Sequence, residues 1–223
     1  MNQYFITATD TDAGKTHFSR AFIRALVALG QQVAVYKPIS AGCYLKEGQL
    51  VNEDALFLLN ESNSGQTLKQ VNPIAFEAPI APHIAAKKQN VVISVKDCLL
   101  GYQNVAKNNV DIIVTEGAGG WRLPLGNNEF LSSFAVQTNQ QVILVVNIKL
   151  GCLNHALLTY EAIINDQLNC VGWVANCQED MPFLDDNISE LTTLIPAPLL
   201  ATFEPQESIE TAAKKINLTL LSL

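Results

Sequence analysis

The sequence predicts an α/β fold in which a mostly parallel β-sheet is flanked by helices on both faces. Short apolar runs alternate with longer stretches of helical character along the 223 residues. The apolar runs are nearly continuous, whereas a sheet with one face in solvent would show polar residues at every second position. Hydrophobic residues make up 48% of the chain, which is enough for a large buried core. The length, and a composition without a Pro/Gly/Ser linker, favour a single domain over residues 1–223.

The predicted strands are five runs rich in β-branched residues, at 4–7, 33–36, 110–115, 142–147 and 171–175. The predicted helices are at 15–29, 53–59, 82–88, 95–107, 154–165 and 183–194. Gly30 stands where the first helix should end, and Ser94 with Asp97 forms the pattern of a capping box at the start of the fourth. Ligands of such sheets bind at the carboxyl ends of the strands, so we expect functional residues there.

The charge balance disfavours two classes of partner. Fourteen basic residues against twenty-one acidic ones give a formal charge of −7, so we expect neither nucleic acid nor an anionic membrane surface as a partner. The chain shows no apolar run of about 18 residues and no export-signal pattern at its start. Its five cysteines include no CxxC pair, and its three histidines have no zinc-site spacing. These features are typical of a reduced, cytoplasmic protein.

The strongest motif joins the first predicted strand to the first predicted helix. Residues 8–16 read ATDTDAGKT. A strand, this loop and a helix, in that order, form the context of a phosphate-binding P-loop. Backbone N–H groups at the helix N-terminus would cradle phosphates, Lys15 would reach the β- and γ-phosphates, and the Thr16 hydroxyl would hold Mg²⁺.

A second set of charged residues follows at other strand and helix ends. Lys37 ends the second predicted strand, Asp54 opens a helix, and Glu116 stands between a strand and a glycine-rich turn. An acidic residue at such a strand end is a common Mg²⁺ partner in P-loop proteins. Thr16, Asp54 and Glu116 together would supply three oxygen ligands of the kind Mg²⁺ prefers.

Each of these residues also has a purely structural interpretation. The GKT sequence can begin an ordinary helix, and Thr9 replaces the first glycine of the usual P-loop pattern. Lys37 can be a solvated lysine, and Asp54 can interact with a helix dipole. Asp10 and Asp12 would repel phosphate unless a substrate amine or Mg²⁺ offsets their charge. The joint occurrence of the residues favours the functional interpretation.

The ordered set of motifs resembles the dethiobiotin synthetase family over nearly the whole chain. The segments that carry the resemblance are TDTDAGKT, YKPISAG, NEDAL, APHI, EGAGGWRLPL, VILVVNIKLGCLNHALLT, GWVAN and TLIPAPLL. The resemblance implies a homodimeric cyclo-ligase that uses Mg²⁺ and ATP, with the substrate site at the subunit interface. Such an enzyme converts 7,8-diaminopelargonic acid and CO₂ into dethiobiotin through a carbamate and a carbamic-phosphoric anhydride.

The resemblance also implies roles for individual residues. Lys15 and Lys37 would be catalytic, and Thr16, Asp54 and Glu116 would hold the metal. The nucleotide would contact Asp12, Ala13, Gly14, Lys15, Thr16, Asp54, Glu116, Gly117, Ala118, Gly119, Asn176, Cys177, Glu204 and Pro205. The substrate would contact Thr11, Asp12, Lys37, Ser40, Ala41, Gly151, Cys152 and Asn154. For the last three residues, an ordinary helix start with Asn154 as N-cap is the structural alternative.

The chain departs from the family pattern at three places. Asp12 stands where the family has Glu, and the order Ser40 then Ala41 displaces the serine that follows the second strand. The segment after PAPLL is shorter than in the family, so Glu204 and Pro205 are the candidates for the nucleotide edge.

Other notable side chains receive no functional role, and two rival functions stay open. We expect His17, His83 and His155 to be neither metal ligands nor catalytic bases, and Trp121 and Trp173 to be packing residues. One rival is a nucleotide switch related to chromosome-partitioning ATPases, although these carry an extra loop lysine where this chain has an aspartate. The other is a relative that binds substrate without turning it over.

Overall fold

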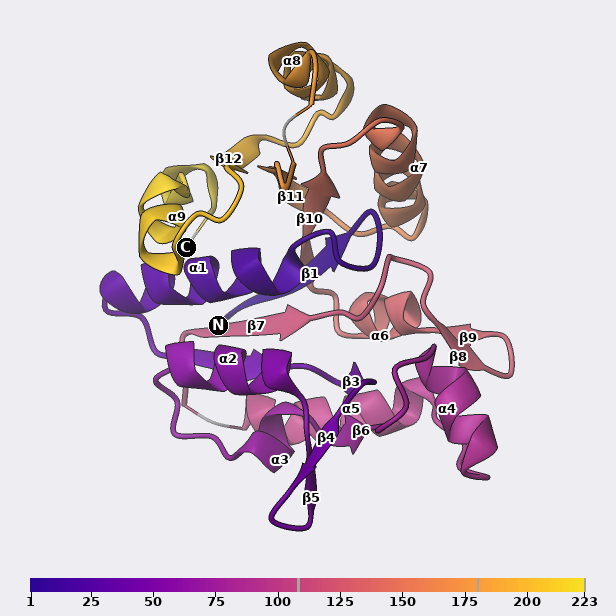
Figure 1. The fold of residues 1–223 in the computed structure, drawn as a ribbon. Helices are drawn as coiled ribbons and strands as arrows, with labels where there is room; N and C mark the ends of the chain where they lie inside the picture. Colours follow the sequence, from indigo (N-terminus) through magenta and orange to yellow (C-terminus); the bar gives the residue numbers. More distant parts are fainter. Residues whose placement is uncertain (108, 180, 223) are drawn as a thin grey trace.

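The computed structural model describes residues 1–107, 109–179 and 181–222 and centres on a six-stranded sheet (Figure 1). The spatial order is β12-β11-β10-β1-β7-β2, and every neighbouring pair is parallel. The strands are β1 (Asn2–Ala8), β2 (Val33–Tyr36), β7 (Ile112–Glu116), β10 (Gln141–Asn147), β11 (Cys170–Asn176) and β12 (Leu199–Phe203). The class predicted from the continuous apolar runs is therefore confirmed.

Helices cover both faces of this sheet, because side chains of alternate strand residues enter different cores. Tyr4 and Ile6 of β1 pack with α1, α2, α3 and α9, whereas Phe5 packs toward α4, α5, α6 and α7. A third cluster joins β10 and β11 to α7 and α8. The helices are α1 (Lys15–Ala28), α2 (Glu53–Glu61), α3 (Leu68–Val71), α4 (Pro82–Lys88), α5 (Val95–Ala106), α6 (Leu131–Gln137), α7 (Cys152–Asn165), α8 (Leu184–Leu194), α9 (Ile209–Lys215) and the 3₁₀ turn η1 (Leu218–Leu220).

Three two-stranded sheets lie outside the main sheet. β3 (Ile39–Ser40) pairs in parallel with β6 (Ile74–Ala75). β4 (Tyr44–Lys46) and β5 (Gln49–Val51) form an antiparallel hairpin, and β8 (Pro124–Gly126) and β9 (Glu129–Phe130) form another. β3 follows β2 directly in the chain, so the β3–β6 sheet lies beyond the carboxyl end of β2, where functional residues were expected.

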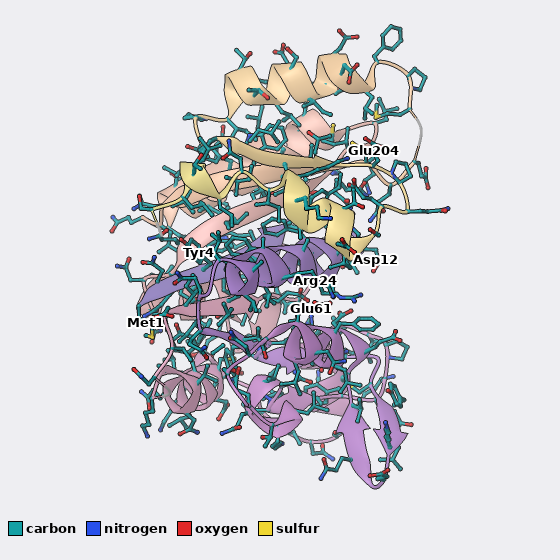
Figure 2. The ribbon with its side chains drawn as sticks, turned by 90° about the vertical axis from the view of Figure 1, so that its left-hand side faces the viewer. Met1, Tyr4, Asp12, Arg24, Glu61 and Glu204 are labelled. Carbon is teal, nitrogen blue, oxygen red and sulfur yellow. The ribbon has the colours of Figure 1, made fainter. Side chains whose placement is uncertain are left out.

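Helix α2 is fastened to α1 by one buried carboxylate. Glu61 accepts from Arg20 at 3.1 Å and from Arg24 at 2.9 Å, and its side chain is 7% exposed. Figure 2 shows Arg24 and Glu61 facing each other across the two helices. The guanidinium of Arg20 also lies 4.4 Å from the centre of the Phe57 ring. The two ion pairs of Glu61 hold α2 against α1 and therefore also hold the residues at the start of α2 in place.

The predicted elements are present, but other elements were not predicted, among them the short strands of the three two-stranded sheets. The sixth strand, β12, was not predicted, because Pro196 and Pro198 just before it read as a loop; an edge strand tolerates such prolines. The short helices α3, α6 and α9 were also missed. The proposed N-cap at Asn154 is wrong, since α7 begins at Cys152 with Gly151 as N-cap at φ 91°.

The predicted helix signals elsewhere are confirmed. Ser94 and Asp97 form the reciprocal capping box of α5. Gly30 follows the end of α1 with φ 83°, a left-handed conformation that glycine adopts without strain. Trp121 and Trp173 are buried, as expected of packing residues. Within the described ranges, no helix is long and apolar enough to cross a membrane.

Candidate functional site

A cavity of about 830 Å³ opens at the carboxyl ends of β1, β2 and β7. Its walls come from the loops that follow these strands and from the starts of α1, α2 and α4. The lining residues are Thr11, Asp12, Gly14, Lys15, Thr16, His17, Lys37, Ser40, Ala41, Asn52, Asp54, Pro79, Ile80, Ala81, Pro82, Glu116, Ala118, Gly119 and Leu123. Sequence segments that are far apart thus meet at the sheet edge where ligands of α/β proteins bind.

The loop between β1 and α1 has the backbone of an anion cradle. Gly14 is the N-cap of α1 at φ 90°, and Asp12 also has a positive φ of 55°. A Cβ on Gly14 would lie 2.0 Å from Nδ2 of Asn176, so this position requires glycine for space as well as conformation. Helix α1 follows immediately, and its first residues, whose N–H groups have no partner within the helix, belong to the cavity lining.

Lys15 is the first residue of α1 and is only 8% exposed. Its Nζ donates to the carbonyl oxygen of Asp10 at 3.4 Å. Burial lowers the pKa of Lys15 from its ordinary value, although the nearby carboxylate of Glu116 opposes this shift. A buried ammonium group with a single weak donor contact is suited to an anion that enters the loop.

The charged residues from three distant segments form one connected cluster. Oε1 of Glu116 accepts from Lys37 Nζ at 2.5 Å and from Thr16 Oγ1 at 3.0 Å. Lys37 Nζ also lies 3.3 Å from Oδ2 of Asp54. Burial alone would lower the pKa of Lys37, but the carboxylates of Glu116 and Asp54 outweigh burial and raise it above the ordinary value. The Lys37 ammonium therefore stays charged inside the protein.

The donor set of this cluster fits Mg²⁺. Oε2 of Glu116 is buried and has no hydrogen-bond partner among the described residues, while the Asp54 side chain is 44% exposed toward the cavity. Residues 1–107, 109–179 and 181–222 contain no group of three His, Cys, Asp or Glu side chains arranged for a metal. Mg²⁺ does not require one, because one or two carboxylates plus substrate phosphates and water complete its shell.

Most of the predicted site residues line this cavity. Thr11, Asp12, Ala41, Ala118 and Gly119 do so in addition to the charged cluster. The hydroxyl of Ser40 also reaches the lining, but it donates to Oδ1 of Asn72 at 2.7 Å and lies 3.2 Å from Sγ of Cys43.

Three predicted residues, Ala13, Gly117 and Asn176, lie just behind the lining. Ala13 is fully buried, and its carbonyl accepts from Nδ2 of Asn176 at 2.9 Å. Gly117 donates its N–H to the carbonyl of Ile6 at 3.0 Å and packs against Phe5. Through this hydrogen bond, Asn176 holds the backbone of the loop between β1 and α1 in place.

The remaining predicted residues stand apart from the described cavity. Cys177 is buried after β11, and Glu204 is exposed after β12, paired with Lys215 at 3.1 Å; Pro205 follows it. Gly151, Cys152 and Asn154 form the start of α7, with Cys152 buried and the other two exposed. Within the described residues of one chain, neither the group after β11 and β12 nor the group at the start of α7 lines the cavity of the charged cluster.

Several lining residues were not predicted. They are His17, Asn52, Pro79, Ile80, Ala81, Pro82 and Leu123. The signal for Asn52 was available in the sequence, since asparagine is a preferred N-cap residue and Asn52 caps α2 by accepting from Ala55 N at 3.1 Å, two residues before Asp54. Pro79 and Pro82 bracket the turn into α4 and form an apolar wall whose position depends on tertiary packing.

Solved structures share this architecture. The chain resembles the septum site-determining protein MinD of Pyrococcus horikoshii in complex with Mg-ADP, with a TM-score of 0.58, 16% identity, and coverage of 96% of this chain and 86% of that one. It also resembles a ParA family ATPase from Chlorobium tepidum, with a TM-score of 0.56, 13% identity, and coverage of 99% and 91%. At these identities the likeness establishes the P-loop fold alone.

Sequence comparisons are more specific. The model of a family described as AAA domain matches residues 2–213. Proteins named ATP-dependent dethiobiotin synthetase BioD are 46% identical in Idiomarina loihiensis, over 91% of this chain and 92% of the relative, and 45% identical in Cellvibrio japonicus, over 98% and 96%. The Pseudoalteromonas translucida protein of that name is 42% identical over 99% and 97%. With this identity along nearly its full length, the chain belongs to the family of ATP-dependent dethiobiotin synthetases.

Proposed function

We propose that this chain closes the ureido ring of dethiobiotin at the cavity beside the GKT loop. The observation that carries the proposal is Glu116, which joins Lys37 and Thr16 within hydrogen-bond distance at the end of that loop. The chain is an ATP-dependent ligase of biotin biosynthesis, as its relatives with 42% to 46% identity are named.

The phosphate end of the nucleotide lies along the loop and the start of α1. Backbone N–H groups at Gly14, Lys15 and Thr16 face the phosphates, and Ala13 and Asp12 complete the loop. Lys15 contacts the γ-phosphate as a buried cation. Thr16, Asp54 and Glu116 hold Mg²⁺, which when bound neutralises charge on the phosphates.

The reaction begins when one amine of 7,8-diaminopelargonic acid takes up CO₂ and loses a proton, which forms a carbamate. A carbamate oxygen then attacks the γ-phosphorus of ATP and ADP leaves. The second amine attacks the carbonyl carbon of the resulting carbamic-phosphoric anhydride, and phosphate leaves as the ring closes. Lys37 neutralises the carbamate and the transferring phosphoryl group, because its ammonium is buried and held charged between two carboxylates.

The diamine end of the substrate occupies the same cavity. Thr11, Asp12, Ser40 and Ala41 line it, and the carboxylate of Asp12 can offset the charge of a substrate amine. The backbone of Gly117, Ala118 and Gly119 approaches the ligand from the glycine-rich turn. This arrangement is mostly positioning and charge stabilisation, which is the part that proteins play in phosphoryl transfer.

The distant carboxylate of the substrate binds Gly151, Cys152 and Asn154 of a second copy in a homodimer. In support, the α7 N-terminus is suited to an anion, and α7 is a helix of 14 residues. Leu150 beside it is 95% exposed and Leu158 is 58% exposed, as expected of residues that a second copy covers.

The adenine end of ATP lies toward Asn176, Cys177, Glu204 and Pro205. These residues follow β11 and β12 at the same carboxyl edge as the phosphate loop. The whole of 1–223 acts as one domain around one sheet, in the cytoplasm, without nucleic acid or membrane as a partner; the net charge of −7 supports the last point.

The test measures phosphate release by purified protein with Mg-ATP and bicarbonate, with and without 7,8-diaminopelargonic acid, while mass spectrometry follows dethiobiotin. We expect release that requires the diamine and matches dethiobiotin mole for mole. Release indifferent to the diamine would favour a nucleotide switch. Diamine binding without release would favour a binding protein that does not turn over.

A further inference from the structure

The outer edge of β2 is not paired with another strand of the main sheet but with amide side chains. In the part of the chain that the structure describes, β2 pairs with β7 on one side only. On the other side, Oδ1 of Asn63 accepts from Val33 N at 2.7 Å. The amide of Gln66 accepts from Val35 N at 2.8 Å and donates to Val35 O at 2.9 Å. These contacts satisfy backbone groups of an edge strand that would otherwise be free.

A third amide, Asn72, binds the backbone of Lys37, the residue that follows β2 and whose ammonium belongs to the charged cluster. Its Nδ2 donates to the carbonyl of Lys37 at 2.7 Å, and Lys37 N donates to Val71 O at 2.8 Å. Asn72 is 6% exposed, so these hydrogen bonds are shielded from water. We refer to Asn63, Gln66 and Asn72 as the amide ladder of β2.

Asn72 differs from the other two members of the amide ladder because it also holds a residue of the cavity. Its Oδ1 accepts from the Ser40 hydroxyl at 2.7 Å. The orientation of the amide follows from its partners, since the Lys37 carbonyl requires the nitrogen and leaves the oxygen for Ser40. One buried side chain therefore ties together Lys37 and Ser40, which both line the cavity.

We propose that Asn72 is a positioning residue for the ring-closing reaction, acting through the backbone of Lys37 and the hydroxyl of Ser40. The inference rests on the proposed function, because it concerns the placement of the Lys37 ammonium against the reacting groups. Asn72 does not line this cavity in the described structure.

The need for such an anchor follows from the chemistry of the segment. Lysine has a flexible four-carbon stem, and Lys37 Nζ is held here by Glu116 and Asp54. When a phosphoryl group draws the ammonium away from these carboxylates, the fixed point that remains is the backbone. Pro38, the next residue, has no N–H to contribute. The backbone of Lys37 is therefore held by its N–H, which donates to Val71 O, and by its carbonyl, which accepts from Asn72; of these two contacts only the second involves a side chain that a substitution can remove.

The experiment compares Asn72→Ala with Gln66→Ala as the matched control. Gln66 is a buried amide of the same ladder that makes two hydrogen bonds to β2 but touches no residue of the cavity lining. For each protein we measure kcat and KM for dethiobiotin formation, the thermal unfolding midpoint, and calorimetric ATP binding. The ATP stoichiometry reports the folded fraction, which separates misplacement of Lys37 from loss of folded protein.

We expect Asn72→Ala to lower kcat by about ten-fold to a hundred-fold with native ATP stoichiometry and a KM for ATP within about two-fold, because small misplacements of a reacting group have effects of this size. Gln66→Ala should lower the unfolding midpoint with kcat within about two-fold of native. Asn72→Asp keeps the shape of the side chain and the acceptor for Ser40 but loses the donor to the Lys37 carbonyl. If the alanine variant does not accumulate as folded protein, this variant tests the positioning role. It should show the same loss of kcat.

Equal kcat values for the Asn72 variants and Gln66→Ala, in an active native enzyme, would overturn the inference alone. The same holds if the loss of kcat matches a loss of ATP stoichiometry. A native protein that forms no dethiobiotin would overturn the proposed function and this inference with it. The two failures are therefore distinct.

Discussion

The two ends of the candidate nucleotide site are built in different ways. At the phosphate end, Glu116 is fully buried and Lys37 is 4% exposed, and both are held by short ion pairs and hydrogen bonds. At the base end, Glu204 is 75% exposed in its side chain and pairs with Lys215 on the surface. The first region is connected to the sheet core, whereas the second consists of loop residues after β11 and β12.

This difference in burial indicates at which end of the site the residue types are constrained. Buried charges persist only with partners, so the phosphate end tolerates few changes of residue type. Exposed ion pairs are screened by water and contribute little, so the base end can vary in length and composition. Substitutions at the two ends should therefore differ in both size and kind of effect.

The largest effect is expected for Lys37→Ala. It removes the ammonium to which we assign stabilisation of the transferring phosphoryl group, and we expect kcat to fall by about a thousand-fold, as for the loss of a preorganised charge contact. Steady-state assays of phosphate release measure this, with circular dichroism to verify folding. Lys214→Ala is the control, because Lys214 is a surface cation paired with Glu210 far from the cavity lining. A Lys37→Ala enzyme with native turnover would remove the charged cluster from the mechanism.

A somewhat smaller effect is expected for Glu116→Gln. The amide keeps the shape and can accept from Thr16, but it removes the charge that faces Lys37 and the free Oε2. We expect about a hundred-fold lower kcat and a higher Mg²⁺ concentration for half-maximal activity. Titration of Mg²⁺ measures this, and a chelator should abolish turnover of the native protein. An unchanged Mg²⁺ requirement would contradict the assignment of Glu116 as a metal ligand.

Much of the fold was predictable because its signals are local. Continuous apolar runs predicted β1, β2, β7, β10 and β11, and the capping box predicted the start of α5. β12 was missed because its register depends on pairing with β11, and the prolines before it carry the opposite local signal. The start of α7 was misplaced because Gly151 adopts a left-handed N-cap conformation that sequence rules assign more readily to helix ends.

The candidate site was predictable where motifs lie at strand ends. The P-loop context placed Lys15 and Thr16, and acidic residues at a strand end and a helix start placed Glu116 and Asp54. Asn72 carries no local signal, since its hydrogen bonds reach Lys37, 35 residues away in the sequence, and Ser40 of β3. Pro79 and Pro82 likewise reach the cavity lining through the tertiary fold and not through a motif spacing.

A moderate effect is expected for Asn176→Ala, at the junction of the two ends. The substitution leaves the carbonyl of Ala13 without its buried donor, which costs about 1–3 kcal/mol in free energy of unfolding. We expect KM for ATP to rise several-fold and kcat to change little. Parallel kinetics with GTP distinguish two roles, because loop support alone weakens both nucleotides equally. A change in the ratio of ATP to GTP use shows that the amide also reads the base.

The smallest effect is expected for Glu204→Ala, and it probes the base end directly. Glu204 makes an exposed ion pair with Lys215, and Glu210 makes a comparable exposed pair with Lys214. Glu204→Ala and the control Glu210→Ala should both leave the unfolding midpoint nearly unchanged, since solvent screens such pairs. If Glu204 borders the nucleotide, its loss raises KM for ATP by about two-fold, the effect of one weak contact, whereas Glu210→Ala leaves KM unchanged. Equal KM values for the two variants would remove Glu204 from the proposed base contacts and leave those nearer to β11, Asn176 and Cys177. The base end would then depend even less on its exposed loop residues than the phosphate end depends on its buried ones.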